Sequence, residues 1–394
     1  MRFVHLSDLH LGYRQYQRQT PSGINQREAD VAAAFRKAIK MTIDLQPDIV
    51  LIGGDIFHNV RPTNPAILHA FIEFSRLVEM LPDCEVIMIA GNHDLPRTSE
   101  TGFILPLFTS LGIHVVTNDA TRIPLKGGEV SVLAIPYGIR PRPSYDPDPS
   151  FRHNILFTHD EVEGVVRKFG TLAERAVGDL TLEELRPERW SYVALGHYHV
   201  YHSVAPNAYY SGSLEYTSTN IWGEAYEEIE KGVNGKGFIE HDLETGKHTF
   251  HHVKPQRRVI NLPELSAVGL TAEALSVAIS KSVDSCQGGI EDQIVRLVVR
   301  DVPRHVLRDL DHKAIREYKR RALHFQLDAR RPQPIRTEAS GAPGRRTSLT
   351  DTVRAMLQTR ALTPGINREA LVDLGLRYLA EADRRASVVV VEPE

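Results

Sequence analysis

The side chains that could do chemistry lie in five segments of the sequence, and each segment follows a short apolar run. They are carboxylates, imidazoles and one amide, namely Asp8, His10, Asp55, Asn92, His159, His197 and His199. Divalent cations of borderline hardness bind such donors when rigid elements hold them, with one carboxylate shared between two ions. Asp55 follows two glycines that let the backbone turn tightly, which makes it the natural bridging carboxylate. The pattern predicts a two-metal centre for phosphoester chemistry.

Taken singly, most of these motifs are weak signals. Asp-x-His after a strand is usually a capped turn, and Gly-Asp is a common turn. Gly91-Asn92-His93-Asp94 is rarer, because it places three polar side chains directly after a buried strand. All the motifs occur together, each at the end of an apolar run, so a joint metal role outweighs separate structural roles. His93, beside Asn92, is a candidate general acid, since an imidazole near its neutral pKa can donate a proton to a leaving alkoxide.

The elements that must position these residues are short buried strands. Strands are predicted at residues 3–6, 48–52, 85–90, 154–157 and 192–195, because these runs are apolar, rich in β-branched residues and stopped by Gly or Asp. Helical patterns at residues 27–45 and 64–81 alternate with the first three strands. The strand ends are expected to share one edge, where ligands bind in sheets of this kind. The fold class is therefore α/β.

The pattern of predicted strands and helices divides the rest of the chain into segments. Strands at residues 209–210, 237–241 and 248–253, without clear helices between them, are expected to complete a sandwich in antiparallel fashion. Residues 256–331 predict a small α/β domain with helices at 272–282 and 312–321 and a strand at 293–299. The predicted domains are 1–255, 256–331, a Pro/Gly/Arg-rich linker at 332–347 and a helical segment at 348–394.

Composition narrows the functional classes. The chain has 394 residues, a net charge of −3 and 25% charged residues, so any contact with nucleic acid must come from a local basic patch. Two cysteines exclude a disulfide framework and a cysteine metal site. No apolar run approaches the length of a membrane span or of a signal-peptide core. A cytoplasmic location, nucleoid-associated in a bacterium, without membrane contact is therefore expected.

The motifs resemble a known family. The series Asp8-x-His10, Gly54-Asp55, Gly91-Asn92-His93-Asp94, His159 and Gly196-His197-x-His199 is similar to calcineurin-like metallophosphoesterases. Four further segments resemble the SbcD-like nuclease of double-strand-break repair: residues 7–13, 54–58, 61–63 and 211–215. Together the matches cover roughly residues 1–260. The resemblance implies a metallophosphoesterase β-sandwich flanked by helices, followed by a DNA-capping domain.

The resemblance also implies cofactors, roles and partners. Two Mn²⁺ ions, or other divalent metals, would bind: one to Asp8, His10, Asp55 and His199, the other to Asp55, Asn92, His159 and His197. His93 would protonate the leaving oxygen. His58 would assist at the substrate side, or else serve as a hydrogen-bonded supporting residue. The implied activity is that of a 3′–5′ exonuclease and endonuclease, which forms a homodimer and works with an SMC-type (SbcC-like) ATPase subunit.

DNA contacts are predicted in two basic segments. Tyr13, Arg14, Tyr16 and Arg18 lie beside the first ligand pair, where arginines suit phosphates and tyrosines can stack on bases. An ordinary polar loop is the alternative. Residues 313–346 carry ten Lys or Arg against three acids, which could guide DNA or form only a flexible linker. The acid-rich stretch 214–237 fits a DNA path poorly, unless it is simply a solvated surface.

The C-terminal segment predicts two short helices, whose apolar residues would suit a helix-in-groove contact with the ATPase or docking on the chain's own body. These residues are Val353, Met356, Leu357, Leu371, Leu374 and Tyr378. The leading hypothesis is thus a Mn-dependent DNA nuclease. The rivals are a stand-alone phosphoesterase acting on small phosphodiesters or phosphomonoesters, and a metal-binding scaffold with little catalysis.

Overall fold

The computed structural model describes residues 1–96, 102–139, 144–163, 180–233, 235–332, 349–360, 362 and 367–388. The chain divides into two compact units, Met1–Pro332 and Gln333–Glu394. The predicted linker at 332–347 lies, apart from Pro332, outside the described residues. None of the helices in the described ranges combines the length and apolar character that a membrane span requires.

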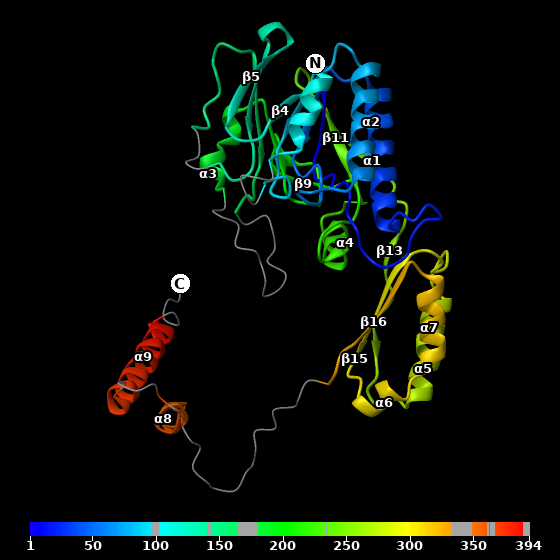
Figure 1. Cartoon of the computed structure of the whole chain (residues 1–394), viewed down its shortest axis with the longest axis vertical. Coiled ribbons are helices and arrows are strands. Elements are labelled where there is room, and N and C mark those ends of the chain that lie inside the picture. Colours follow the sequence, from blue (N-terminus) through cyan, green and yellow to red (C-terminus); the bar gives the residue numbers. More distant parts are fainter. Residues whose placement is uncertain are drawn as a thin grey trace. The chain divides into compact units, whose positions relative to one another are not determined.

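Two six-stranded sheets form a sandwich in the first unit (Figure 1). The first has the order β12 (His248–His252), β11 (Gly237–Asp242), β1 (Arg2–Leu6), β2 (Ile49–Gly53), β3 (Glu85–Ile89) and β4 (His114–Val116). The second has the order β5 (Thr121–Leu125), β6 (Val130–Ile135), β7 (His153–His159), β8 (Tyr192–Gly196), β10 (Ala208–Tyr210) and β9 (His202–Ala205). The central strands pair in parallel, whereas β11, β12, β5 and β9 pair antiparallel. The predicted α/β sandwich is confirmed, and only β10, which pairs in parallel with β8, departs from the expected antiparallel completion.

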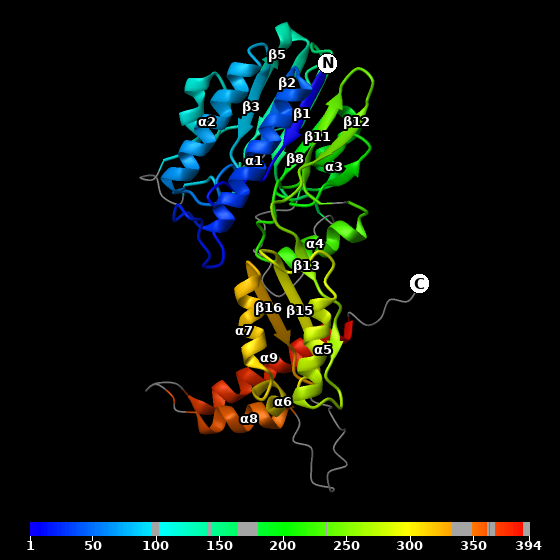
Figure 2. The ribbon, with the colours of Figure 1, turned by 90° about the vertical axis from the view of Figure 1, so that its right-hand side faces the viewer.

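Side-chain alternation explains how the layers pack. In β2, Ile49 and Leu51 enter the core between the sheets, whereas Val50 and Ile52 pack on the opposite face. That face is covered by α1 (Gln26–Leu45) and α2 (Asn64–Met80), which lie side by side (Figure 2). Short elements complete the sandwich: η1 (Leu105–Leu111), η2 (Lys126–Gly128), α3 (Leu182–Leu185) and η3 (Pro187–Arg189).

The carboxyl ends of β1, β2, β3, β7 and β8 carry the polar motifs. The sequence predicted one shared sheet edge, but these strands belong to both sheets. Parallel pairing within each sheet aligns the ends, and the face-to-face packing of the sheets brings the two rows together. The site is therefore built at one end of the sandwich.

A third sheet follows the sandwich in the first unit. Its strands β13 (Val259–Asn261), β14 (Leu265–Ser266) and β16 (His324–Ala329) all pair in parallel with β15 (Ile294–Arg300). The helices α5 (Ala272–Asp284), α6 (Arg304–Arg308) and α7 (His312–Arg321) share a separate hydrophobic core with it. This part begins close to the predicted boundary at 255–256, which stays a prediction because both parts belong to one compact unit.

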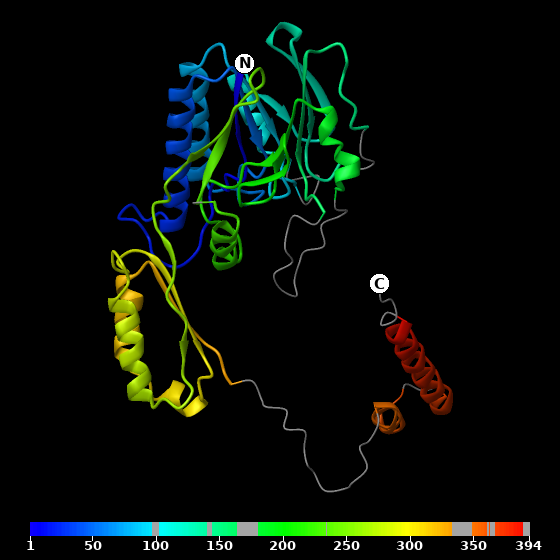
Figure 3. The same cartoon turned by 180° about the vertical axis from the view of Figure 1, so that it is seen from behind.

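The helices α3, α4 and α6 were not predicted from sequence, and α4 bears most on the site. The sequence predicted no clear helix between residues 209 and 260, but α4 (Ile221–Glu230) lies there, beside the third sheet (Figure 3). Ile221 and Trp222 of α4 pack against Ile294 and Leu323. Most of the acidic side chains here are not a solvated surface: Glu215, Glu224, Glu227 and Glu228 are buried, whereas Glu230 is exposed. The acid-rich stretch is thus largely internal structure.

The second unit contains α8 (Leu349–Thr359) and α9 (Arg368–Val388). The two helices pack closely, since a Cβ added to Gly375 would lie 2.6 Å from Cδ1 of Leu357. Val372 is buried, but Met356, Leu374 and Tyr378 are exposed. The helix pair therefore leaves part of its apolar surface uncovered.

Candidate metal centre

The structure brings the seven predicted ligands together at the end of the sandwich. In one group, Nε2 of His10 lies 3.0 Å from Nε2 of His199, and Nε2 of His199 lies 3.8 Å from Oδ1 of Asp8. In the other, Oδ1 of Asn92 lies 3.1 Å from Nε2 of His159 and 3.0 Å from Nδ1 of His197. The two groups correspond to the two predicted ligand sets.

Asp55 lies between the groups. Its Oδ2 is 3.6 Å from Nε2 of His10 and 3.7 Å from Nε2 of His159, so one oxygen faces both sets. Its Oδ1 instead accepts a hydrogen bond from the backbone N–H of His93, at 2.8 Å, which fixes the carboxylate plane. This geometry is what a bridging ligand needs, although the role itself stays a prediction.

Unusual backbone angles orient the side chains of four predicted ligands. Asp8, His10, Asp55 and His197 all have positive φ, at 54°, 46°, 51° and 98°. Left-handed backbone is unfavourable for residues with a Cβ and persists only where surrounding contacts impose it. Four strained residues among seven predicted ligands are the mark of a functional site.

Glycines and a buried aspartate hold the loops in place. A Cβ at Gly91 would lie 2.2 Å from Oδ1 of Asp55, and a Cβ at Gly196 would lie 1.9 Å from the carbonyl oxygen of Gly53. The carboxylate of Asp94 accepts backbone hydrogen bonds from Ile56, Phe57 and Gly91. Asp94 thus ties the loop after β2 to the loop after β3. No role was predicted for Asp94, although it is the last residue of the Gly-Asn-His-Asp motif.

The electrostatics fit divalent cations. Burial lowers the pKa of His197 to about 3, and burial together with neighbouring histidines lowers the pKa of His10 well below the usual value. Burial, then the Lys236 ammonium and neighbouring histidines, lower the pKa of His199 in the same way. The imidazoles are therefore neutral at pH 7, as metal ligands must be. Burial raises the pKa of Asp8 and of Asp55 to about 6, because their charges are held away from water. Buried acceptors that face one another without a compensating charge suit a bound cation.

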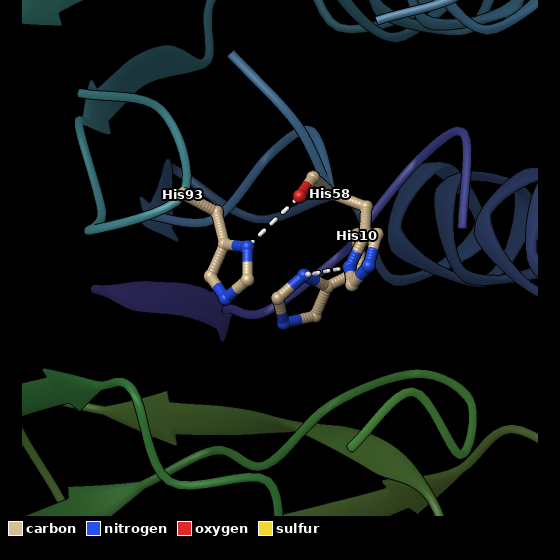
Figure 4. A group of neighbouring side chains, drawn as sticks. All are labelled: His10, His58 and His93. Carbon is tan, nitrogen blue, oxygen red and sulfur yellow. Dashed lines mark hydrogen bonds between the residues drawn. The ribbon is translucent and has the colours of Figure 1, made fainter. Parts of the chain in front are cut away.

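His93 and His58 lie beside the predicted ligand His10 (Figure 4). Nδ1 of His93 lies 2.8 Å from the carbonyl oxygen of His58 and donates to it, which leaves Nε2 for proton exchange. Nδ1 of His58 lies 3.4 Å from Nδ1 of His10, a distance that suits the predicted supporting role of His58. Burial, and then the charge on His93, lowers the pKa of His58 to about 4.

A cleft of about 730 Å³ opens at these residues. His58, Asn92 and His93 line it together with Arg61 and Tyr137. The ring of Tyr137 stacks on His197 at a centroid distance of 6.1 Å. Tyr137 was missed from sequence, since it follows a strand, β6, that was not predicted.

The four predicted DNA contacts are all engaged within the chain. Tyr13 is buried and donates to Gln15, and Arg14 pairs with Glu28 at 2.6 Å. Tyr16 stacks on His324 at 4.0 Å, and Arg18 pairs with Asp292. The loop therefore connects the sandwich to the third-sheet part, and its contact with DNA stays a prediction.

Comparison with known proteins identifies the family. Residues 1–201, about half of the chain, match the calcineurin-like phosphoesterase family. The chain belongs to this family. The predicted family, fold class and phosphoesterase enzyme class are thereby confirmed, and the family membership agrees with a site for divalent metal.

Similar curated proteins are archaeal. The "DNA double-strand break repair protein Mre11" of Methanocaldococcus jannaschii is 30% identical over 249 residues, which are 60% of this chain and 61% of that protein. The Mre11 protein of Methanococcus maripaludis is 28% identical over 253 residues, 62% of this chain and 63% of that protein. That of Thermoplasma acidophilum is 27% identical over 272 residues, 65% and 67% respectively. The chain thus matches less than two thirds of the length of the first two relatives.

Proposed function

We propose that the chain is a Mn²⁺-dependent DNA nuclease, a 3′–5′ exonuclease and endonuclease that acts in double-strand-break repair. One observation carries the phosphodiesterase step: two sets of buried donors share Oδ2 of Asp55, and His93 lies at their edge. Asp8, His10, Asp55 and His199 would hold one ion, and Asp55, Asn92, His159 and His197 the other. Two divalent cations bound there would polarise the phosphate and activate water.

Residues of the chain would then donate the proton and contact the substrate. His93, anchored through Nδ1 to the carbonyl of His58, presents Nε2 for donating a proton to the leaving oxygen. His58 would orient His10 and face the substrate from the same cleft.

Support for DNA as substrate comes from basic and aromatic residues of a second groove and from the relatives, whose names refer to DNA double-strand-break repair. Tyr16, Arg18 and Lys319 line a groove of about 690 Å³. α7 adds Lys313 and Arg316 to this basic surface. Cations that follow a backbone and an aromatic ring that stacks on bases are typical of nucleic-acid grooves.

The activity test uses duplex DNA with labelled ends and Mn²⁺. Wild type should cleave it, chelation should stop cleavage, and His93→Ala should lower the rate by about 10²–10⁴-fold, the usual effect of losing a general acid. A protein that hydrolyses a small chromogenic phosphodiester rapidly but leaves DNA intact would overturn the nuclease and favour a small-substrate phosphoesterase. Equal cleavage by wild type and His93→Ala would remove His93 from the chemistry.

We also propose that the helix pair of the second unit binds the coiled-coil root of an SMC-type ATPase. Met356, Leu374 and Tyr378 form an exposed apolar surface on that pair, which suits a helix-in-groove contact. Met356→Asp with Tyr378→Asp should abolish co-purification with such a coiled coil, whereas Gln358→Asp, a change of an exposed polar residue on α8, should not. Unchanged binding by the double variant would exclude this surface.

A homodimer is proposed through α1 and α2. A groove of about 400 Å³ between them is lined mostly by apolar residues, and Leu68 and Ile72 on its rim are 61% and 52% exposed. Leu68→Glu with Ile72→Glu should give a monomer in light scattering after size exclusion. Met80→Glu, on the same helix but outside the groove, is the control. A dimer that survives the double change would exclude this face.

A further inference from the structure

A buried charged cluster lies behind one of the predicted ligands. We call it the Lys236 cluster, and it consists of Lys236, Glu224, Glu228 and Tyr216. The ammonium of Lys236 pairs with Glu224 and with Glu228, at 2.8 Å for Glu228, and lies 4.5 Å from the centre of the Tyr216 ring. All four side chains are buried. Desolvated charges of this kind are costly unless they are paired, so a cluster of this type is retained where it holds something in place.

The Lys236 cluster holds His199 from two directions. The Lys236 ammonium donates to the backbone carbonyl oxygen of His199 at 3.0 Å. Oε1 of Glu224 lies 3.9 Å from Nδ1 of His199, a buried nitrogen that makes no hydrogen bond within the described residues. Hydrogen bonds from Ser213 and Ser218 reach the Glu224 carboxylate as well, which limits its rotation.

The tautomer of His199 explains why a carboxylate near Nδ1 matters. Nε2 of His199 faces His10 and Asp8 and is the nitrogen on the metal side. When Nε2 binds a cation, the ring proton must sit on Nδ1, where it points toward Glu224. A carboxylate 3.9 Å from that nitrogen is too distant for a hydrogen bond, but its charge favours the tautomer with the proton on Nδ1, as carboxylates beside metal-binding histidines do.

The remaining face of α4 is fixed as well. Ile221 and Trp222 pack against Ile294 and Leu323, and the guanidinium of Arg296 lies 4.9 Å from the Trp222 ring. The helix that carries Glu224 is thus anchored on the third-sheet part while its acidic face supports His199. Glu224 therefore cannot move away from His199 without disturbing that packing.

We propose that Glu224 is a positioning residue for the metal ligand His199, and that Lys236 fixes Glu224 and the His199 backbone together. The inference rests on the proposed two-metal function and adds residues that neither touch the substrate nor bind the ions. Replacing Glu224 should lower the affinity for only one of the two ions, since His199 belongs to one ligand set.

The test compares two matched variants of the full chain. Glu224→Gln and Glu228→Gln each remove one carboxylate from the same helix and the same lysine, but only Glu224 faces His199. Calorimetric titration of the metal-free proteins with MnCl₂ should show two binding events in wild type. In Glu224→Gln the affinity of one event should fall about 10-fold or more, the scale expected for a residue that supports a metal ligand. Glu228→Gln should stay within about 2-fold of wild type, because it leaves Glu224 in place.

Thermal unfolding and activity give independent readouts. Both variants should lower the Tm of the metal-free protein similarly, and added Mn²⁺ should restore the activity of Glu224→Gln. Equal metal affinities in the two variants, or no rescue by Mn²⁺, would overturn the positioning role. A wild type that binds no Mn²⁺ would instead overturn the proposed function itself. Should Glu224→Gln fail to fold, Glu224→Asp, which keeps the charge but shortens its reach, gives the same comparison.

Discussion

The metal centre and the Lys236 cluster both bury carboxylates, but they differ in the source of the compensating positive charge. In the cluster, Lys236 supplies an ammonium that pairs with Glu224 and Glu228. In the metal centre, Asp8 and Asp55 face neutral imidazoles, and burial raises the pKa of both carboxyls to about 6. A buried carboxylate that is paired with a lysine stabilises the fold, whereas a buried carboxylate without such a partner is suited to bind a cation from solution.

The largest expected effect follows from removing the shared carboxylate. Asp55→Asn should lower phosphodiesterase activity by at least about 10²–10³-fold and weaken both Mn²⁺-binding events, because Oδ2 of Asp55 faces both ligand sets. The Tm of the metal-free protein should not fall, since the change removes an uncompensated buried charge. Activity assays and calorimetry measure the first effect and thermal unfolding without metal the second. A large loss of stability in the metal-free variant would contradict the contrast between the two regions.

The second effect concerns the Lys236 cluster. Lys236→Met should destabilise the protein by about 3–5 kcal/mol, because it leaves two buried glutamates without their cation. Urea unfolding in the absence of metal measures the free energy of unfolding. Lys40→Met, which removes an exposed ion pair with Asp44, should change it by less than about 1 kcal/mol. Similar losses of unfolding free energy in the two variants would show that burial of the ion pair does not increase its contribution to stability.

The smallest expected effect comes from a half-buried histidine that needs no cation at all. His248 stacks on Tyr209 and bonds to Tyr201, and burial lowers its pKa to about 4. The unfolded chain, with a pKa near 6.5, binds the proton more readily, so stability is complete above about pH 6.5 and falls as the pH drops toward 4. One such histidine contributes a slope of at most about 1.4 kcal/mol per pH unit.

The change His248→Gln removes this contribution together with the effect of His248 on the pKa values of His5 and His241, since glutamine keeps a polar group near Tyr201 but cannot bind the proton. Urea unfolding of wild type and variant at several values between pH 5 and 7.5 should show a shallower pH dependence in the variant. The metal-site histidines contribute equally to both proteins, so they cancel in the difference. Parallel curves would mean that His248 keeps the same pKa in the folded and unfolded chains.

The clustering of the predicted metal ligands could be expected from sequence because each of their segments carries its own signal. Asp8, Asp55 and His159 each end a buried strand, and parallel strands bring such ends together. The Lys236 cluster had no such signal, because Glu224 and Lys236 are ordinary surface residues until the chain brings them together. α4 escaped prediction for a related reason: Ile221 and Trp222 pack on the third-sheet part, while Tyr226 and Ile229 are exposed, so its apolar residues mark no single core face.

The left-handed backbone at Asp8, His10, Asp55 and His197 has a consequence for how ions bind. The folding of the sandwich sets these angles, together with the glycine contacts and the Asp94 bonds that enforce them. The predicted ligands are therefore held in place before any ion is bound, and a cation would not first have to order a loop. We expect the affinity for a metal to depend on the stability of the strands whose ends carry these residues, such as β7, which ends at His159.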